Sequence, residues 1–234
     1  MKAGATLRSL LANRQILLQE HRHYWVFTHE DLSFTLHTKG KGFPLLPLDV
    51  VHHEPEKVVA FVLSRLNLNK RVFARKCKVV RIERNVARTF LNVHHLMNYA
   101  QAAFHYGLVY KDELVAVAAF SRGRKMNRLS ATQRSFEMVR FCSASGVTVT
   151  GGLTKLIAHF VKTHAPGDVM TYIDKNWAQP ETFIKSGFQL MGETPPLTYA
   201  IDRKKFTRVN NAALELDNVE WVTTGGNIKL VYTP

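Results

Sequence analysis

The chain has few acidic residues, very little cysteine and no long apolar run. Its 234 residues include 18 Asp and Glu against 32 Lys and Arg. Cys77 and Cys142 are too few for the disulfide framework of a small secreted domain. No apolar run approaches the roughly 20 residues of a membrane-spanning helix, and the N-terminus lacks the apolar core of a signal peptide. We therefore expect an intracellular, cytoplasmic protein with reduced thiols and no membrane partner.

The composition that remains is that of a folded protein with an unusual charge. Hydrophobic residues make up 46% of the chain and charged residues 21%, so a proper core can form and wholesale disorder is excluded. The length suits one large domain, or one domain of about 150 residues with an appendage. The formal net charge of +14 is hard to explain for an ordinary small-molecule enzyme. It suits a protein that meets phosphate groups.

The cations are clustered in two stretches. The first runs from Arg65 to Arg88 and contains a single acid, Glu83. Its basic residues are Arg65, Lys70, Arg71, Arg75, Lys76, Lys78, Arg81, Arg84 and Arg88. The second runs from Arg122 to Arg140, with Glu137 as its only acid. These stretches indicate either a nucleic-acid or nucleotide surface, or a solvated basic face.

The periodicity of apolar residues predicts the secondary structure and the domain division. In residues 1–69 we expect a helix over 5–19, strands around 24–28 and 32–37, and a helix from Pro55 to Leu66. From residue 70 onward the pattern predicts strands over 72–81, 106–110, 114–120, 136–142, 169–173, 188–191, 199–202 and 229–232. Helices are expected over 85–98, from 153 onward and over 180–186. This order predicts an α/β (α+β) fold with one mixed central sheet flanked by helices. Residues 1–69 would form an N-terminal extension and residues 70–234 the main domain.

One loop combines a strand end, glycines and a helix start. The strand over 136–142 leads into a loop of small residues, Ser143–Gly152, and the loop opens a helix at Leu153. The free N–H groups of a helix start attract anions, and glycines let the backbone come close to them. The pattern is therefore suited to a pyrophosphate group.

The segment Phe136–Phe188 resembles the GNAT superfamily of acyl-coenzyme A N-acyltransferases. In that family a strand, a glycine-containing loop and a helix hold the pyrophosphate of coenzyme A, and a later Tyr-x-Lys-x-Gly-Phe closes the site. The resemblance implies a GNAT-like fold and acetyl-CoA or another acyl-CoA as cofactor. The cofactor-binding residues that it implies lie on the strand end, the loop and the helix start: Phe141, Ser143, Val147, Thr148, Val149, Thr150, Gly151, Gly152, Leu153, Thr154 and Lys155.

Two positions depart from the family pattern. The usual Arg/Gln-x-x-Gly-x-Gly/Ala loop aligns with residues 147–152, so its basic or amide residue and its first glycine are missing. Phe183 stands where the family has the Tyr that protonates the leaving thiolate. Either another group supplies that proton, or the chain is not a conventional acetyltransferase.

A closer resemblance covers about Lys70–Lys229. It is to phage-associated GNAT-like domains that often sit behind homing-endonuclease modules. Its landmarks are Arg71–Cys77, Phe90–Leu96, Glu113–Val115, Met138–Cys142, Gly151–Leu156, Asp174 with Trp177, Lys185–Phe188 and Gly226–Lys229. Mom-type DNA modification proteins, which acylate adenine in DNA to block restriction, are similar to this fold. The resemblance implies DNA as a partner.

Asp174 and Arg140 are the first catalytic candidates. Asp174 follows a predicted strand at the end where open α/β sheets collect their ligands. It is either a general base or the cap of the following turn. Arg140 interrupts an apolar strand, so its guanidinium needs either an ion-pair partner or a polar cleft with a substrate or phosphate.

Histidines and tyrosines complete the catalytic candidates. His94 and His95 end a predicted helix, and one of them is a plausible proton carrier near neutral pH; we select His95. A structural histidine is the alternative. Tyr172 and Tyr99 are candidates for the missing phenol, and we select Tyr172. No metal site is predicted.

The expected nucleic-acid contacts are basic or aromatic. The loop after residue 120 suits backbone phosphate, and Trp177 is either a stacking platform for an extruded base or part of the core. The selected residues are Arg75, Lys76, Arg122, Arg124, Lys125, Arg128 and Trp177. We therefore expect an acyl-CoA-dependent N-acyltransferase acting on a nucleobase amine in DNA, in phage-type DNA modification that resists restriction. The alternatives are a non-catalytic DNA-binding or accessory module with this fold and, more weakly, an acyltransferase for a protein or small amine.

Overall fold

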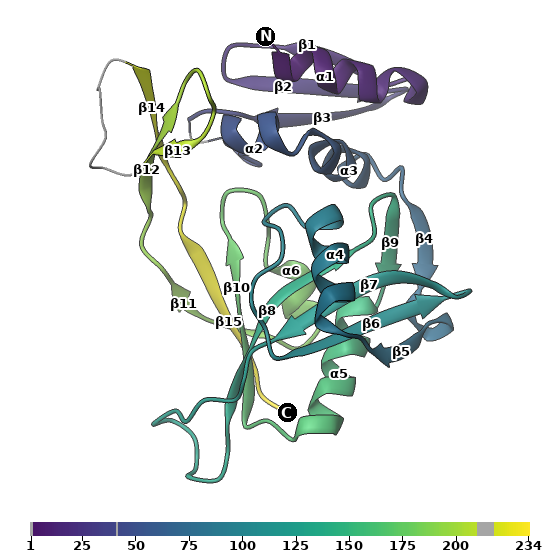
Figure 1. Ribbon diagram of the computed structural model, residues 1–234, viewed down its shortest axis with the longest axis vertical. Helices are drawn as coiled ribbons and strands as arrows, with labels where there is room; N and C mark the ends of the chain where they lie inside the picture. Colours follow the sequence, from purple (N-terminus) through teal and green to yellow (C-terminus); the bar gives the residue numbers. More distant parts are fainter. Residues whose placement is uncertain (1, 41, 210–217) are drawn as a thin grey trace. The chain divides into compact units, whose positions relative to one another are not determined.

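The computed structural model describes residues 2–40, 42–209 and 218–234 of the chain (Figure 1). Its contacts divide the chain into two compact units. The first unit comprises Met1–Leu68, Asp174–Gln179 and Thr194–Asn227, and the second, the sheet unit, comprises Asn69–Ile173, Pro180–Glu193 and Ile228–Pro234. The division after residue 68 lies close to the predicted one at 69. Unlike that prediction, segments 174–179 and 194–227 belong with the first unit.

The first unit begins with helices packed beside a small antiparallel sheet. The sheet has the order β1-β2-β3, and α1 contacts α2, α3 and β1. The elements are α1 (Lys2–Leu11), η1 (Ala12–Arg14), β1 (Leu17–Glu20), β2 (Tyr24–His29), β3 (Leu32–His37), α2 (Leu48–His53) and α3 (Pro55–Arg65). The helix predicted over 5–19 is wrong beyond Leu11, because the chain turns through Gln15 at φ 53° and enters β1. The strands around 24–28 and 32–37 and the helix at Pro55 are confirmed, whereas α2 was not predicted.

A second antiparallel sheet of the first unit has the order β13-β12-β14. Its strands are β12 (Thr198–Asp202), β13 (Arg208–Val209) and β14 (Val219–Thr223). The strand predicted over 199–202 therefore exists, but the prediction that it joins the central sheet is wrong. All five residues of β12 pair with β14, a strand that the sequence pattern did not reveal.

The sheet unit is built on seven strands in the order β11-β15-β10-β8-β7-β6-β5. The strands are β5 (Lys78–Arg81), β6 (Phe104–Tyr110), β7 (Glu113–Phe120), β8 (Ser135–Ser143), β10 (Asp168–Asp174), β11 (Gln189–Glu193) and β15 (Asn227–Tyr232). The helices are α4 (Arg84–His94), α5 (Gly152–His164) and α6 (Glu181–Lys185). β5 to β8 pair antiparallel, and β8 pairs parallel with β10, so the sheet is mixed.

Helices α4 and α5 cover opposite faces of this sheet (Figure 1). Successive side chains of a strand point to opposite faces. Val117 and Ala119 of β7 pack in a cluster with α4, whereas the ring of Phe120 stacks on Phe160 of α5 with centroids 3.9 Å apart. All of these side chains are buried, which explains the continuous apolar run of β7. The predicted fold class, α/β (α+β) with a mixed central sheet flanked by helices, is confirmed.

A short parallel pair lies apart from the seven-stranded sheet. It joins β4 (Lys70–Phe73) to β9 (Val147–Thr150), and η2 (Ala74–Lys76) follows β4 directly. The prediction of one strand over 72–81 is therefore wrong, because η2 divides this stretch into β4 and β5. The predicted loop Ser143–Gly152 contains β9. Within the described residues no helix has the length and apolarity needed to cross a bilayer.

An ion pair with a buried carboxylate holds the start of β10. The Asp168 side chain is 3% exposed, and Arg128 donates to its Oδ2 from Nε at 3.0 Å and from Nη2 at 2.6 Å. Arg128 Nη2 also lies 3.3 Å from the hydroxyl of Ser135, the first residue of β8. Removing one member of such a pair leaves the other charge buried without compensation. Arg128 therefore joins the two central strands where their ladder begins.

We expect Arg128→Ala to lower the free energy of unfolding by roughly 3 kcal/mol, the lower end of the range for breaking a buried pair, because Arg128 is 35% exposed. Urea unfolding followed by circular dichroism measures the change. Arg122→Ala is the matched control, since Arg122 is exposed, and it should change stability by no more than about 0.5 kcal/mol. Equal stability of the two variants would contradict the structural role of Arg128.

Candidate functional site

The two central parallel strands pair briefly and then separate. Their ladder joins Asp168, Val169 and Met170 of β10 to Ser135, Phe136 and Glu137 of β8. Both strands continue, β8 to Ser143 and β10 to Asp174. Beyond the ladder one edge of β8 pairs with β7 as far as Ser143, while its other edge no longer pairs with β10. Beyond the ladder the two strands do not pair with each other, although Thr171 Oγ1 of β10 still donates to Met138 O of β8 at 2.9 Å. Backbone groups left unpaired at such a separation can bind a ligand as an added strand does.

A β-bulge lies in β8 where the strands part. Ala119 of β7 pairs with Arg140, and the next residue, Phe120, pairs with Met138. Val139 is therefore the extra residue on β8. A bulge bends its strand and re-aims the side chains around it, and bulges are common beside active sites. The sequence carries no signal for this bulge, because β8 alternates normally on either side of it.

The Arg140 guanidinium binds backbone carbonyls. Nε donates to Asn98 O at 3.0 Å, Nη1 to Val139 O at 2.9 Å and Nη2 to Met97 O at 3.4 Å. Burial lowers the pKa of Arg140, and Glu137 opposes that effect. The residue thus ties the segment after α4 to the bulge of β8. In this geometry the Arg140 side chain positions backbone segments, a role that neither predicted alternative, an ion pair or a polar cleft with a substrate or phosphate, had named.

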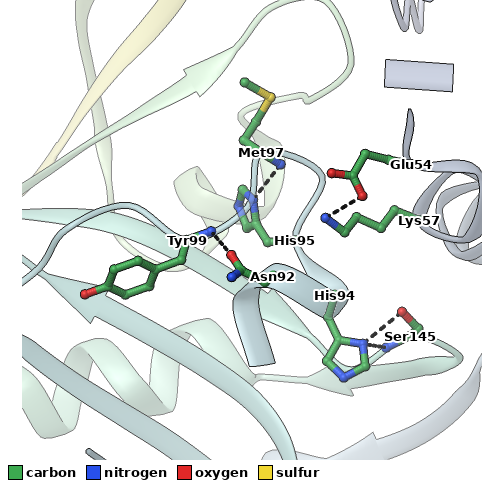
Figure 2. A network of polar contacts seen from close by, with 8 residues as sticks. All are labelled: Glu54, Lys57, Asn92, His94, His95, Met97, Tyr99 and Ser145. Carbon is green, nitrogen blue, oxygen red and sulfur yellow. Dashed lines mark hydrogen bonds and ion pairs between the residues drawn. The ribbon is translucent and has the colours of Figure 1, made fainter. Parts of the chain in front are cut away.

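The end of α4 holds a network of polar contacts (Figure 2). His94 Nδ1 lies 3.0 Å from Ser145 Oγ and accepts the Ser145 N–H at 3.1 Å, and His95 Nδ1 accepts the Met97 N–H at 3.0 Å. A backbone N–H can only donate, so Nδ1 is the acceptor in both rings. Each neutral ring then carries its proton on Nε2. His95 is therefore arranged to donate from Nε2, and Nδ1 is not available as a base.

Of the two candidate phenols, Tyr172 is the more exposed. The Tyr99 hydroxyl lies 3.3 Å from Nε2 of His105, which is 5% exposed, and the guanidinium of Arg88 lies 5.4 Å from the Tyr99 ring centroid. Tyr172 lies on β10 and is 40% exposed. Phe183 packs edge-to-face on Phe188 with centroids 5.7 Å apart, so its ring contributes to packing. The geometry favours Tyr172 over Tyr99.

The start of α5 has two glycines with different roles. Gly151 is the exposed N-cap and has φ 75°, a conformation that L side chains rarely adopt. Gly152 is buried, and a Cβ there would lie 3.1 Å from Val149 Cγ1, so a side chain at this position would require Val149 to shift by a few tenths of an ångström. Val149 and Leu153, which were predicted to bind the cofactor, are buried as well. Their part in a site is to hold the backbone, and no side-chain contact with a ligand follows from their positions.

The segment η2 lies beside this helix start. Lys155 Nζ donates to Ala74 O at 2.9 Å and to Cys77 O at 2.6 Å, and a Cβ on Gly151 would lie 3.7 Å from Ala74 Cβ. Lys155 is thus a structural tie, although it was predicted to contact the cofactor. The exposed Arg75 and Lys76 of η2, predicted as nucleic-acid contacts, are brought to the start of α5 instead. Sequence analysis missed this because contacts between residues far apart in the chain, such as the pairing of β4 with β9, join the two segments.

Asp174 caps the turn that follows β10. Its Oδ1 accepts the Asn176 N–H at 2.8 Å, and the Trp177 side chain donates to the same carboxylate. Burial raises the pKa of Asp174, while these two hydrogen bonds and Arg208 oppose the rise. The capping role that the sequence left open is therefore present. A carboxylate with a raised pKa and fixed orientation is also suited to general-base chemistry.

Trp177 is held by its neighbours in the first unit. Its carbonyl accepts a hydrogen bond from Arg65 Nη2 at 2.8 Å, and its side chain orients Asp174. This geometry supports a positioning role more directly than base stacking. Among the loop cations, Arg122, Arg124 and Lys125 are exposed, whereas Arg128 is committed to Asp168. Arg128 thus has a structural role, and its contact with nucleic acid stays a prediction.

No family model and no curated protein matches the chain. Among solved structures, the chain is similar to an acetyltransferase of Bacillus subtilis in complex with CoA, with 11% identity and a TM-score of 0.44. It is also similar to an IAA acetyltransferase of Bacillus cereus, with 11% identity and a TM-score of 0.42. A GNAT family acetyltransferase of Elizabethkingia anophelis with acetyl-CoA bound has 9% identity and a TM-score of 0.39. Each alignment covers 68% of this chain and 99% of the other.

Proposed function

We propose that the protein is an acyl-CoA-dependent N-acyltransferase whose acceptor is a nucleobase amine in DNA. The observation that carries the proposal is the separation of β8 from β10 beside the start of α5. The pantetheine arm of coenzyme A contains amide groups, which can pair with an open strand edge as an added strand does. The pyrophosphate would then meet the free N–H groups at Gly151 and Gly152. The family pattern places a basic or amide residue at position 147, where this chain has Val147. Arg75 and Lys76 on η2 would supply the missing positive charge.

The chemistry is transfer of an acyl group from sulfur to nitrogen. The amine nitrogen attacks the thioester carbonyl carbon, whose oxygen is polarised by a backbone N–H near Phe141–Ser143. The C–N bond forms, the C–S bond breaks, and Asp174 orients the amine or accepts its proton. The leaving thiolate takes a proton from the phenol of Tyr172, since Phe183 has none to donate, while the neutral His95 can offer it a hydrogen bond from Nε2. An exocyclic base amine is a poor nucleophile, so positioning must supply much of the rate.

The charge supports DNA as the acceptor. The net charge of +14 and the exposed Arg122, Arg124 and Lys125 suit a phosphate backbone. The resemblance to phage DNA modification proteins adds the anti-restriction role. Phe183 favours a second candidate, a DNA-binding module that keeps the fold without the chemistry.

Gly151→Asp and Gly151→Asn form a matched pair for the coenzyme site. Asn and Asp both tolerate positive φ, and they differ mainly in charge. If pyrophosphate binds at this helix start, Gly151→Asp should bind coenzyme A at least about tenfold more weakly than Gly151→Asn, because like charges repel at short range. Calorimetry measures both affinities, and thermal melts confirm that both variants fold. Equal affinities, or no binding by the native protein, would remove the donor assignment.

Asp174→Asn tests the chemistry. The Asn side chain keeps a carbonyl oxygen that accepts the Asn176 N–H, so the turn should hold. We expect modified nucleoside, measured by mass spectrometry after incubation with DNA and acyl-CoA, to fall by about 10²-fold or more. Phe183→Tyr is the control, and it should be tolerated because it adds one hydroxyl to an existing ring. Full modification by Asp174→Asn would exclude its catalytic role. Absence of modified nucleoside from the native protein with any acyl-CoA would favour the binding module.

Salt dependence tests the DNA contact. Each neutralised phosphate contributes about 0.9 to the slope of log affinity against log salt. Replacing Arg122 and Arg124 by Ala should therefore flatten the slope by about 1.8. Lys111→Ala combined with Lys162→Ala removes as much exposed charge elsewhere in the sheet unit and should leave the slope unchanged. A native slope near zero would leave the charge without a role in DNA binding.

A further inference from the structure

The turn between β12 and β13 carries cations that the sequence analysis did not single out. It runs from Asp202 to Arg208, and Arg203, Lys204 and Lys205 are consecutive and exposed. In the described part of the chain, none of these three side chains makes an ion pair. A run of exposed cations is often only a solvated surface. In this turn, however, hydrogen bonds and ring contacts fix the backbone at several residues.

Asp202 holds the turn from within. Its Oδ1 accepts the Lys204 N–H at 2.7 Å and the Lys205 N–H at 2.8 Å, and these bonds lower the pKa of Asp202. Its carbonyl accepts the Phe206 N–H at 2.8 Å, and its own N–H donates to Thr207 O at 2.9 Å. The carboxylate of Asp202 is therefore bound to backbone N–H groups, and the nearby charges of Lys204 and Lys205 also act on it.

Contacts with α2 hold the turn from outside. The ring of His52 stacks on Phe206 with centroids 3.4 Å apart, and His53 Nε2 donates to Phe206 O at 3.0 Å. Phe206 has φ 54°, which L residues rarely adopt and which persists only where neighbours enforce it. Burial lowers the pKa of His52, so the charge of this surface comes from the arginine and lysines.

Further contacts hold both ends of the turn. The Arg203 N–H donates to Asn218 O at 3.0 Å. Arg208 Nε donates to Asp49 Oδ2 at 2.8 Å, and its guanidinium lies 4.2 Å from the Tyr199 ring centroid. Burial and the neighbouring Asp49 raise the pKa of Tyr199 to about 12, so the stacked ring stays neutral. The cations thus extend from a backbone whose conformation is set before any partner arrives.

We infer that this turn, residues 202–208, binds the phosphate backbone of duplex DNA. Phosphate contacts fix the orientation of a protein on DNA without reading its sequence. A turn that is already ordered loses less conformational entropy on binding. The inference rests on the DNA partner proposed above. It adds a contact made by the first unit, separate from the loop that carries Arg122 and Arg124.

The test replaces Arg203, Lys204 and Lys205 together by Gln and measures affinity for duplex DNA by fluorescence anisotropy across a range of salt. If each cation meets one phosphate, the slope should flatten by about 2.7. A control variant with Arg14, Arg22 and Lys162 replaced by Gln loses the same charge at exposed positions and should keep the native slope. Coenzyme A binding should be unchanged in both variants, which also shows that they fold.

A second pair of variants separates charge from order. Asp202→Asn and Asp202→Ala remove the same negative charge, but only Asn keeps an oxygen that accepts the two N–H groups. If only charge matters, both variants should bind DNA with the same affinity, and more tightly than the native protein does. If the held turn is the binding element, Asp202→Ala should bind DNA several-fold more weakly than Asp202→Asn.

Each result decides between the inference and its rivals. If the triple Gln variant has the same salt slope as its control, the turn does not bind DNA. The proposal of DNA as the partner is kept in that case if the variant without Arg122 and Arg124 still shows a flatter slope. Equal affinities of the two Asp202 variants overturn the need for order. Native protein that binds anionic lipid vesicles and no DNA overturns both this inference and the proposed acceptor.

Discussion

The early separation of β8 from β10 is the constraint on which the candidate site depends. Two parallel strands at the centre of a sheet normally satisfy each other's backbone groups along their whole length. Here only three residues of each strand pair, and both strands continue. The Arg128–Asp168 pair joins the strands where their ladder begins, and the bulge at Val139 lies in β8 just beyond the end of the ladder. Backbone groups that the sheet leaves unpaired become available to a ligand.

Many of the cations that suggested a phosphate surface have structural roles in the sheet unit. Arg140 binds three backbone carbonyls, Lys155 binds two, and Arg128 pairs with a buried carboxylate. A buried cation must find such partners, since desolvation without compensation is costly. These contacts hold the segment after α4, the segment η2 and the start of β10. Exposed cations on η2, on the loop after β7 and on the turn between β12 and β13 are among those that remain for a partner.

The segment after β10 shows how neighbouring residues determine the orientation and the pKa of the candidate Asp174. Asn176 is 8% exposed, and its Oδ1 accepts the Gly225 N–H at 2.7 Å while its carbonyl accepts the Leu45 N–H at 2.6 Å. Arg65 holds the carbonyl of Trp177, and Trp177 orients Asp174. The carboxylate is therefore fixed by residues from distant parts of the chain. Its raised pKa results from this burial, and the residue type alone does not imply it.

The sequence by itself determined the strongly patterned elements. The alternation and apolar runs of β2, β3, β6 and β7 predict their strands, Pro55 marks the start of α3, and Gly151-Gly152 marks the start of α5. These signals are local, because periodicity and helix capping depend on neighbours in sequence. The fold class followed from the order of the elements. Phe183, which removes the expected acid, was also evident from sequence alone.

Only the tertiary structure decided where the separate segments meet. The pairing of β4 with β9 brings Arg75 and Lys76 to the start of α5, and the pairing of β12 with β14 removes residues 198–202 from the central sheet. The bulge at Val139 and the bonds of Arg140 to Asn98 O and Met97 O depend on contacts between residues far apart in the chain. Hydrogen bonds and burial of this kind leave no period in the sequence. The sequence therefore does not distinguish a basic residue that binds a carbonyl inside the fold from one that extends toward a phosphate outside it.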